Sequence, residues 1–408
     1  MSSTNGQAVQ RRKKVLFIAE AVTLAHVGRM LALAASLDPK RYQVLVAADP
    51  RYNNAIGVQS VAMRPIHTIS SQRFFSALAS GSPIYDAQTL IEYAQADQQL
   101  IEDYQADIVV GDFRLSLAAS ARLCNKPYIN VTNAYWSPYA QLQYIVPEIP
   151  LTRALGPGIA QHLFNLARPI AFAQHAHPVN RMLKHFGYPT LARDLRYTYT
   201  EADSVCYADS PLLVPTSRLP AHHHFIGPVL WSVAQPDPEW WHSIPPDKPV
   251  IYINLGSSGQ GELLPILLPA LATLPVSVIV ATAGRAQLPT QADNVYLTDF
   301  IAADKACQLA SLVIGNGGSP SCYLALHHGK PSLSLPVNLD QYLNATLFTK
   351  AGVGSMLRSG TLKPRQFADT VQSMLDSASL QQTTTLLAQQ LQQHNAATDF
   401  GAVLANYA

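Results

Sequence analysis

The start of this sequence lacks an apolar run long enough to cross a membrane. Residues 15–25 form the longest such run near the N-terminus, but Glu20 interrupts it, and it falls short of the roughly 20 residues that a membrane-spanning helix needs. The run also ends without a clear signal-peptide cleavage site. We therefore expect a soluble, cytoplasmic protein without a transmembrane segment.

The sequence also has little net charge and few cysteines. Its 28 basic and 26 acidic residues leave a net charge of +2, and the only basic run is residues 11–14. Nucleic acid is a poor partner for a chain with this balance. The four cysteines are widely scattered and form no Cys-x-x-Cys pair, which favours buried reduced thiols over a disulfide framework or a zinc site.

The order of apolar runs predicts two α/β domains. At 408 residues the chain exceeds the size at which a single core usually stops growing. Short apolar runs alternate with helical patterns in both halves, which implies two doubly wound parallel sheets, each covered on both faces. The expected strands are 15–19, 42–48, 106–111 and 128–132 in the first half and 249–255, 276–281, 295–297, 312–314 and 331–335 in the second.

A proline-rich linker over residues 236–248 is expected between the halves, because proline fixes φ and removes a backbone donor. We expect a disordered basic N-terminus over 1–14, an N-terminal domain over 15–235 and a C-terminal domain over 249–385. The tail over 386–408 is helical by propensity and can pack back on the N-terminal domain. Two such sheets that face each other form an interdomain cleft at the carboxyl ends of their strands.

A glycine turn follows the expected strand 312–314. Gly317 and Gly318 lead into a helix start with Ser319 or Ser321 near the N-cap. Such a turn exposes backbone N–H groups and the positive end of the helix dipole, which suits a phosphate. An ordinary tight turn between a strand and a helix explains these glycines equally well.

A carboxylate and an amide, Asp340 and Gln341, follow the next strand at the same rim of the sheet and could hold sugar hydroxyls. The segment from Asn316 to Ala345 resembles the donor-binding block of the UDP-glycosyltransferase (GT1) family, which includes bacterial natural-product and macrolide glycosyltransferases. That family has a His-Gly-Gly turn, a Ser or Thr, a Gly-x-Pro and an Asp-Gln pair 24 residues beyond the His. Here Asn-Gly-Gly begins at position 316, Gly-Lys-Pro occupies 329–331 and Asp340 has the matching spacing.

The order of elements also agrees with that family over nearly the whole chain. The resemblance implies a GT-B architecture of two facing Rossmann-like sheets, and a glycosyltransferase whose donor is a UDP-sugar or a dTDP-sugar, with no metal. It places the glycine turn and Ser321 on the diphosphate and Asp340 with Gln341 on the sugar. The donor-binding residues that it implies are Gly256, Ser257, Ser258, Phe300, Ile301, Asn316, Gly317, Gly318, Ser319, Ser321, Asp340 and Gln341.

Two residues depart from the family pattern. Asn316 stands in the place of the diphosphate-binding histidine, so it can donate a neutral hydrogen bond but cannot carry a positive charge. Leu324 stands in the place of a glutamate that holds ribose hydroxyls in the plant members. A thymidine donor, which lacks one ribose hydroxyl, therefore remains as open as a uridine donor.

His26 lies between the first expected strand and its helix. The helix dipole disfavours the charged form of a histidine there, so the ring stays neutral and can accept a proton near pH 7. A surface or capping histidine is the ordinary alternative, as a helix-capping aspartate is for Asp112. The resemblance implies instead that His26 is the catalytic base and Asp112 its orienting acid, for an inverting transfer to an acceptor hydroxyl.

No metal site is expected. The chain has no Asp-x-Asp sequence, which is the usual Mg²⁺ or Mn²⁺ motif of the other large glycosyltransferase fold. His222, His223 and His224 precede an expected strand over 225–227, and adjacent side chains of a strand alternate faces, so they cannot all reach one ion.

The acceptor is expected to be small and apolar, such as a natural product, a phenol or a lipid-like molecule, and the protein to be a monomer or weak homodimer. A catalytically silent protein that binds a nucleotide sugar or a partner enzyme remains an alternative, which Asn316 favours. A nucleotide-sugar 2-epimerase is another, and it would form product without an acceptor. The aromatic residues that could line an acceptor pocket, although core packing would use them too, are Phe74, Phe75, Tyr85, Trp136 and Tyr139.

Overall fold

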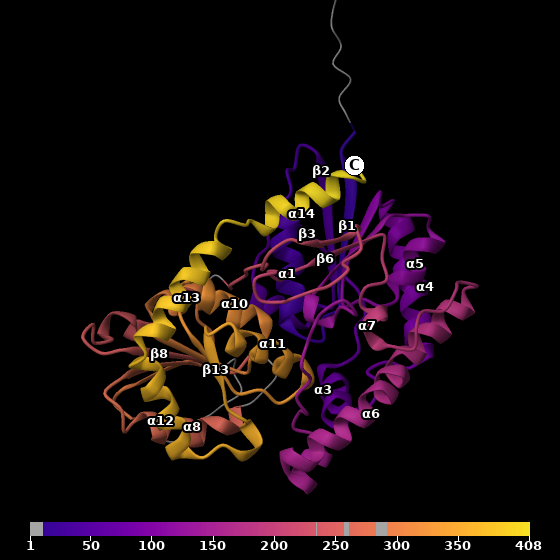
Figure 1. Ribbon diagram of the computed structural model, residues 1–408. Helices are drawn as coiled ribbons and strands as arrows, with labels where there is room; N and C mark the ends of the chain where they lie inside the picture. The colour runs from indigo at the N-terminus through magenta and orange to yellow at the C-terminus, as the bar shows by residue number, and fades with distance from the viewer. Residues whose placement is uncertain (1–10, 234, 257–260, 283–291) are drawn as a thin grey trace, which may run out of the picture.

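Two parallel β-sheets, each with helices packed on its faces, make up the molecule (Figure 1). The computed structural model describes residues 11–233, 235–256, 261–282 and 292–408. The first half contains a seven-stranded sheet in the order β3-β2-β1-β4-β5-β6-β7, and the second half a six-stranded sheet in the order β10-β9-β8-β11-β12-β13. The predicted pair of doubly wound sheets is confirmed.

The sheet of the N-terminal half is built from strands whose central members are buried on both faces. Its strands are β1 Lys13–Ala19, β2 Tyr42–Ala48, β3 Ala62–Pro65, β4 Ile108–Asp112, β5 Tyr128–Thr132, β6 Ser204–Tyr207 and β7 His223–Phe225. Its helices are α1 Leu24–Ala35, α2 Asn53–Ile56, α3 Ser71–Ser80, α4 Ala87–Tyr104, α5 Leu117–Leu123, α6 Pro150–His185 and α7 Leu195–Thr198, with 3-10 turns at Pro50–Tyr52 and Ala134–Trp136.

The C-terminal half repeats this arrangement and adds a helical end. Its strands are β8 Val250–Asn254, β9 Ser277–Ala281, β10 Val295–Thr298, β11 Leu312–Gly315, β12 Ser332–Ser334 and β13 Gly354–Met356. Its helices are α8 Leu264–Leu271, α9 Ala303–Leu309, α10 Ser319–His327, α11 Leu339–Lys350, α12 Pro364–Leu375, α13 Ala378–Leu391 and α14 Ala396–Ala405, with 3-10 turns at Glu239–Ser243, Gly261–Leu263 and Ser359–Thr361.

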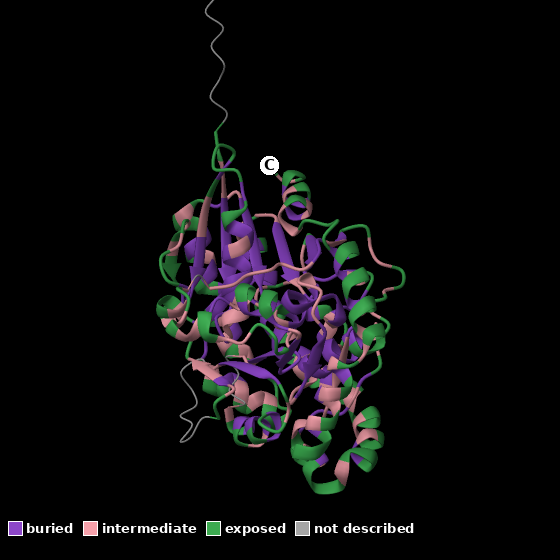
Figure 2. Ribbon diagram, turned by 90° about the vertical axis from the view of Figure 1, so that its left-hand side faces the viewer, coloured by how far each residue is buried: buried purple, intermediate pink, exposed green. Residues whose placement is uncertain are grey.

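The core of each half lies between its sheet and the helices, so the strands are buried while the outer helix faces are exposed (Figure 2). A further apolar cluster joins the two halves. In it, Tyr135 and Tyr207 of the N-terminal half pack with Tyr323, Leu343 and Phe348 of the C-terminal half. The halves are therefore held together by apolar burial as well as by the chain.

The chain passes between the halves twice. After β7 it enters the C-terminal half, and after α13 it returns, so that α14 packs on the N-terminal sheet (Figure 1). Phe400 of α14 lies 5.9 Å from Phe17 of β1, between ring centroids. The two passages lie close together, since a Cβ added to Gly227 would be 3.7 Å from Cβ of His394.

Some predicted boundaries differ from the structure. Lys13 and Lys14 belong to β1, where Lys14 N donates to Asp107 Oδ2 over 2.8 Å, so the expectation of disorder is wrong for these two residues. The strand expected over 225–227 is β7, which begins two residues earlier. The short strands β3, β6 and β13 were not expected, although β6 contains the buried apolar residues Val205, Cys206 and Tyr207. Within the expected linker, Trp240 packs on Tyr296 of the C-terminal half, 5.4 Å between ring centroids.

Candidate active site

A cavity of about 590 Å³ lies between the two halves at the carboxyl ends of the central strands. In each sheet the order of successive strands reverses next to the first strand, between β1 and β4 in one half and between β8 and β11 in the other. Ligands of open α/β sheets bind at such points. Residues from both halves line the cavity, so a molecule in it contacts both sheets. Of the predicted site residues, those that line it are His26, Phe74, Phe75, Asp112, Trp136, Gly256, Phe300, Ile301, Asn316, Gly318, Ser319, Ser321, Asp340 and Gln341.

His26 and Asp112 form a hydrogen-bonded pair in the cavity wall. His26 Nδ1 lies 2.9 Å from Asp112 Oδ1. They meet because β1 and β4 are parallel neighbours, with Ala19 opposite Asp112, and the loop after β1 leads directly into α1. Asp112 is buried, whereas the His26 side chain is 19% exposed, so the imidazole keeps a free side toward the cavity. The ring stacks on Phe113, 5.1 Å between centroids.

A third residue, Arg29, shares the carboxylate of Asp112. Its Nε donates to Asp112 Oδ2 over 2.7 Å and its NH2 group donates to Oδ1 over 3.1 Å. Burial raises the pKa of Asp112, but Arg29 and then His26 outweigh burial and hold this pKa below its ordinary value. Arg29 was not predicted as a site residue, although its position three residues after His26 puts both side chains on one face of α1.

A chain of polar side chains continues from Arg29 to the C-terminal half. Arg29 donates from NH1 to Asn133 Oδ1 over 3.1 Å, and Asn133 Nδ2 donates to Ser319 Oγ over 3.1 Å. The same amide nitrogen lies 3.2 Å from both oxygens of Asp209. Burial raises the pKa of Asp209 to about 6, against the backbone N–H of Ala134 and the Asn133 amide. Asn133 and Asp209 belong to no local motif, so no sequence pattern points to them.

The glycine turn has the shape that the sequence predicts, with one difference. Gly317 has a φ of +81°, and a Cβ there would lie 3.1 Å from the carbonyl oxygen of Gln341. Gly317 is therefore needed for the close packing of the turn on α11. It was expected to contact the diphosphate, but it does not line the cavity. Gly318 is the N-cap of α10 and has no side chain to occupy the N–H groups of the first turn. Its own N–H donates to Asn316 Oδ1 over 3.0 Å and Pro320 has no N–H, which leaves those of Ser319 and Ser321 to meet an anion.

The two predicted sugar-binding residues, Asp340 and Gln341, have different surroundings in the structure. Asp340 lines the cavity, and its Oδ1 accepts a hydrogen bond from Trp136 Nε1 over 2.7 Å across the two halves. Gln341 instead caps α11, because its Oε1 accepts from Val337 N over 2.9 Å, and Asn338 accepts from Gln341 N in return. Only the amide nitrogen of Gln341 is left to meet a sugar hydroxyl, because its side-chain oxygen is already bonded within the cap.

The remaining donor residues lie on the first and third loops of the C-terminal half. Gly256 has a φ of +74° and donates from its N–H to Asn254 Oδ1 over 3.0 Å. Phe300 is 42% exposed, which fits a ring that is free to contact a flat ligand. Ser257 and Ser258 lie outside the described residues.

The acceptor side of the cavity is aromatic, although not every predicted residue contributes. Tyr85 is buried in the core against Tyr93, and Tyr139 packs edge-on against His223, 5.3 Å between ring centroids. Neither lines the cavity, since Tyr85 is part of the core and the half-buried Tyr139 packs on His223. The aromatic side chains that line the cavity from the N-terminal half include Phe74, Phe75, Phe113, Trp136 and Tyr199, of which Phe113 and Tyr199 were not predicted.

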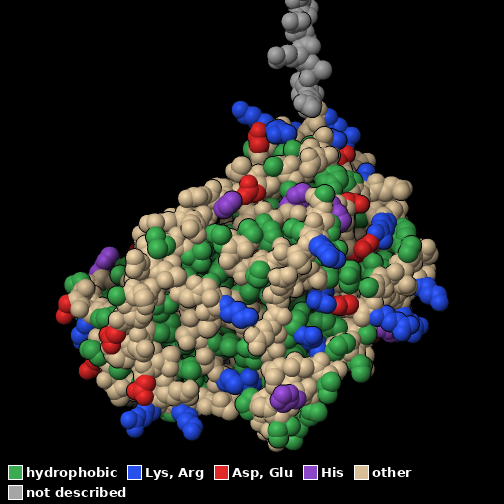
Figure 3. Space-filling model, viewed as in Figure 1, with side chains coloured by type: hydrophobic (Ala, Val, Ile, Leu, Met, Phe, Trp, Pro, Cys, Tyr) green, Lys and Arg blue, Asp and Glu red, His purple; other side chains and the backbone are tan. Residues whose placement is uncertain are grey.

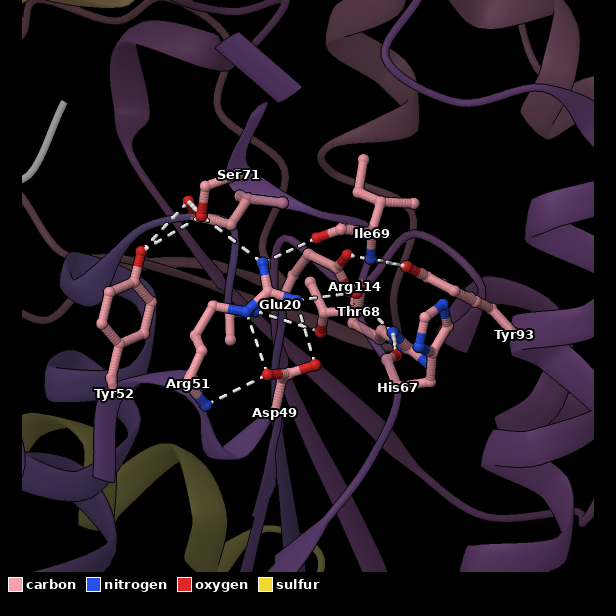
Figure 4. Close-up of polar contacts among 12 residues, drawn as sticks. Glu20, Asp49, Arg51, Tyr52, His67, Thr68, Ile69, Ser71, Tyr93 and Arg114 are labelled. Carbon is pink, nitrogen blue, oxygen red and sulfur yellow. Dashed lines mark hydrogen bonds and ion pairs between the residues drawn. The ribbon is translucent and has the colours of Figure 1, made fainter. Parts of the chain in front are cut away.

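A dense network of polar contacts holds the loop that leads into α3 (Figure 4). Arg51 lines the cavity, and its guanidinium bonds Asp49 and the carbonyl groups of Thr68 and Ile69, the last two over 2.8 Å each. Beneath it, fully buried Arg114 donates to Glu20 over 2.7 Å. Because the bonds of Arg51 hold the loop before α3, the position of the aromatic residues of α3 is fixed.

The two sheets and the cavity between them define the GT-B fold of glycosyltransferases. A spinosyn rhamnosyltransferase, solved in complex with thymidine diphosphate, has this fold with a TM-score of 0.65 over 95% of this chain and 98% of that chain, at 18% sequence identity. Residues 266–403 also match the family described as erythromycin biosynthesis protein CIII-like, C-terminal domain. Across the residues that the structure describes, no helix has the length and apolar character needed to cross a membrane.

Two curated relatives establish the family. A PGL/p-HBAD biosynthesis glycosyltransferase of Mycobacterium tuberculosis (strain ATCC 25177 / H37Ra) is 43% identical over 94% of this chain and 90% of that protein. A PGL/p-HBAD biosynthesis rhamnosyltransferase of Mycobacterium bovis (strain BCG / Pasteur 1173P2) is 44% identical over 93% and 84%. The chain belongs to this family of GT1-type bacterial glycosyltransferases, and it is a glycosyltransferase.

Proposed function

We propose that the protein transfers a sugar from a nucleoside diphosphate to a hydroxyl of a small apolar acceptor, with inversion at the anomeric carbon and without a metal. One observation carries the proposal: His26 Nδ1 and Asp112 Oδ1 lie 2.9 Å apart in the wall of the same cavity that the glycine turn lines. The acid–base pair comes from one half and the diphosphate site from the other, so both reactants meet between them.

In this mechanism Asp112 accepts a hydrogen bond from Nδ1–H and thereby fixes the tautomer of His26, which leaves Nε2 to accept a proton. The acceptor hydroxyl gives its proton to Nε2 while its oxygen forms a bond to the anomeric carbon. Asp112 then stabilises the imidazolium. General base catalysis of this kind contributes roughly 10²- to 10⁴-fold to the rate.

The bond from the anomeric carbon to the diphosphate breaks on the opposite face of the sugar, so the configuration inverts. The electron pair goes to the departing diphosphate oxygen. Its charge is stabilised by the N–H groups at the start of α10 and by the hydroxyl groups of Ser319 and Ser321, which line the cavity. No step of this mechanism requires a metal ion.

Two features favour a thymidine diphosphate sugar as the donor. Leu324 lines the cavity and offers no hydrogen bond to a ribose hydroxyl, so a deoxyribose loses nothing there. The spinosyn rhamnosyltransferase with the same fold was solved with thymidine diphosphate. On the acceptor side, the aromatic wall suits a phenolic or lipid-like molecule, because it offers apolar area and few polar partners.

The proposal is tested by incubating the full chain with dTDP-sugars and UDP-sugars of known anomeric configuration, with and without phenolic acceptors, and reading the product configuration by NMR. We expect inversion, a preference for dTDP-sugars, and an unchanged rate in excess EDTA. Retention of configuration would contradict the mechanism, and a rate lost in EDTA and restored by Mg²⁺ would contradict metal independence. Epimerised nucleotide sugar formed without an acceptor would favour an epimerase.

A further inference from the structure

Helix α6 exposes an unusual amount of apolar surface. It runs along the lower right edge of the molecule in Figure 1, and its first turns project below the body. Gly156, with a φ of 72°, breaks the helix near its start. After this break, four large apolar side chains are exposed to solvent: Ile159 61%, Leu163 42%, Leu166 77% and Ile170 65%.

These four side chains lie on one face, and the same face becomes basic further along. Their spacing of four, three and four residues keeps them in line on an α-helix. Continuing at steps of seven, four and three residues, the line reaches His177, Arg181 and Lys184, all exposed. The face is thus an apolar stripe followed by a basic stripe.

The whole segment around this face has no acidic residue. Residues 149–193 contain no Asp or Glu, and Figure 3 shows hydrophobic and basic side chains along the lower right edge of the molecule. Arg168 packs over the Tyr144 ring, 4.0 Å from its centroid. The segment's other Arg and Lys residues are exposed: Arg153, Arg181, Lys184 and Arg193.

The opposite face of α6 packs beside the acceptor side of the cavity. The Phe172 ring lies 6.5 Å from that of Trp136, which lines the cavity, measured between centroids. Val179 and Met182 belong to the apolar cluster of Phe74, which also lines the cavity. The exposed face is therefore attached firmly to the wall that an apolar acceptor would contact.

We propose that this face of α6 docks on an anionic lipid surface. Its apolar side chains enter the boundary between headgroups and acyl chains, while Arg181 and Lys184 meet lipid phosphates. The segment carries only positive charge, because it has Arg and Lys but no Asp or Glu, and this charge complements an anionic surface. A two-fold dimer through the same face would instead bring two acid-free, basic segments together, which like charges disfavour. The proposal does not depend on the reaction, because lipid binding is measured without substrates.

The test measures co-sedimentation of the full chain with vesicles of phosphatidylcholine alone or mixed in equal parts with phosphatidylglycerol. We expect binding to the anionic vesicles that weakens in high salt. Ile159→Asp/Leu166→Asp should weaken it roughly tenfold or more. Arg181→Gln/Lys184→Gln should weaken it about fivefold per residue. Leu386→Asp is the matched control, since Leu386 is 53% exposed on α13, and it should bind like the parent.

Three outcomes would overturn the proposal. The parent protein could stay in the supernatant with both kinds of vesicle. The α6 variants could bind as strongly as the parent while melting at the same temperature. Sedimentation velocity without vesicles could show a dimer that Ile159→Asp/Leu166→Asp converts to a monomer, which would assign the face to a second copy. If the aspartate variant unfolds, the two glutamine substitutions still decide the question, because they leave the apolar stripe intact.

Discussion

Asn133 of the N-terminal half donates a hydrogen bond from Nδ2 to Ser319 Oγ at the start of α10, over 3.1 Å. The other end of the same amide accepts from Arg29, which holds Asp112. The acid–base pair and the proposed diphosphate site are therefore connected through two side chains. A change in the charge of this network should therefore affect both the His26–Asp112 pair and the start of α10.

Arg29→Met should move the acidic limb of the pH profile of kcat/KM to higher pH. Without the guanidinium, burial raises the pKa of Asp112 with less opposition, so the carboxylate that orients His26 becomes protonated at a higher pH. Arg29→Lys is the control, because it keeps the positive charge but loses the two-pronged geometry, and should shift the limb less. An unchanged limb in Arg29→Met would show that Arg29 is only a structural partner of Asp112.

His26→Ala should leave the affinity for the nucleotide donor nearly unchanged while transfer falls by roughly two to four orders of magnitude. The donor is proposed to bind mainly the C-terminal half, whereas His26 acts on the acceptor. Calorimetry measures the affinity for the donor, and product formation measures the rate of transfer. His162→Ala, at an exposed histidine of α6, is the matched control.

The acceptor chosen should change the size of this effect. A phenol is already partly ionised near its pKa of about 10, as tyrosine is, and should depend on His26 less than an aliphatic alcohol does. If His26→Ala transferred sugar to both acceptors as fast as the parent, another group would have to take the proton.

Asp340→Ala should weaken binding of the intact nucleotide sugar far more than binding of the free nucleoside diphosphate, because Asp340 is proposed to meet the sugar while the glycine turn meets phosphate. The carboxylate also accepts from Trp136 Nε1, so the alanine variant loses two partners. Trp136→Phe removes that hydrogen bond and keeps the carboxylate, which separates the two contributions. Equal losses for both ligands in Asp340→Ala, measured by calorimetry, would refute this division of roles.

Asp209 should make the protein less stable as the pH rises from about 4 to about 6. Its pKa is raised to about 6 in the folded state, above the ordinary value of about 3.9, so the folded state binds the proton more tightly in this window. The contribution is fully present below pH about 4 and is lost as the pH rises through 6. Relative to Asp209→Asn, the free energy of unfolding of the parent should fall by up to about 3 kcal/mol over this window, from urea melts. A constant difference between the two proteins would contradict the shift.

Strands buried on both faces, such as β4 and most of β1, were predicted because a parallel strand between two layers must be apolar along its length. The strands that were not predicted are short, and β3 has mostly exposed side chains, so its pairing with β2 comes from the backbone rather than from a pattern. His26 and Asp112 were found because each lies in the loop or strand end that the family resemblance singles out.

The rest of the site depends on contacts between distant positions. Arg29 and Asn133 are 104 residues apart in sequence, and no local pattern reports their hydrogen bond. Gln341 is different, because Asn338 and Gln341 have the spacing of a capping box and could have been recognised as one from the sequence. Tyr85 and Tyr139 show why aromatic residues alone do not identify a pocket, since a ring suits a core as well as a pocket.

Gly227 and His394 lie beside each other, one on each passage of the chain between the halves, since a Cβ added to Gly227 would lie 3.7 Å from Cβ of His394. Gly227 has a φ of +79°, a conformation that residues with a side chain rarely adopt, so a substitution there would be strained whatever the space around it. Because the two connections run side by side here, the strain of Gly227→Ala would fall on the junction of the halves rather than on the core of either sheet.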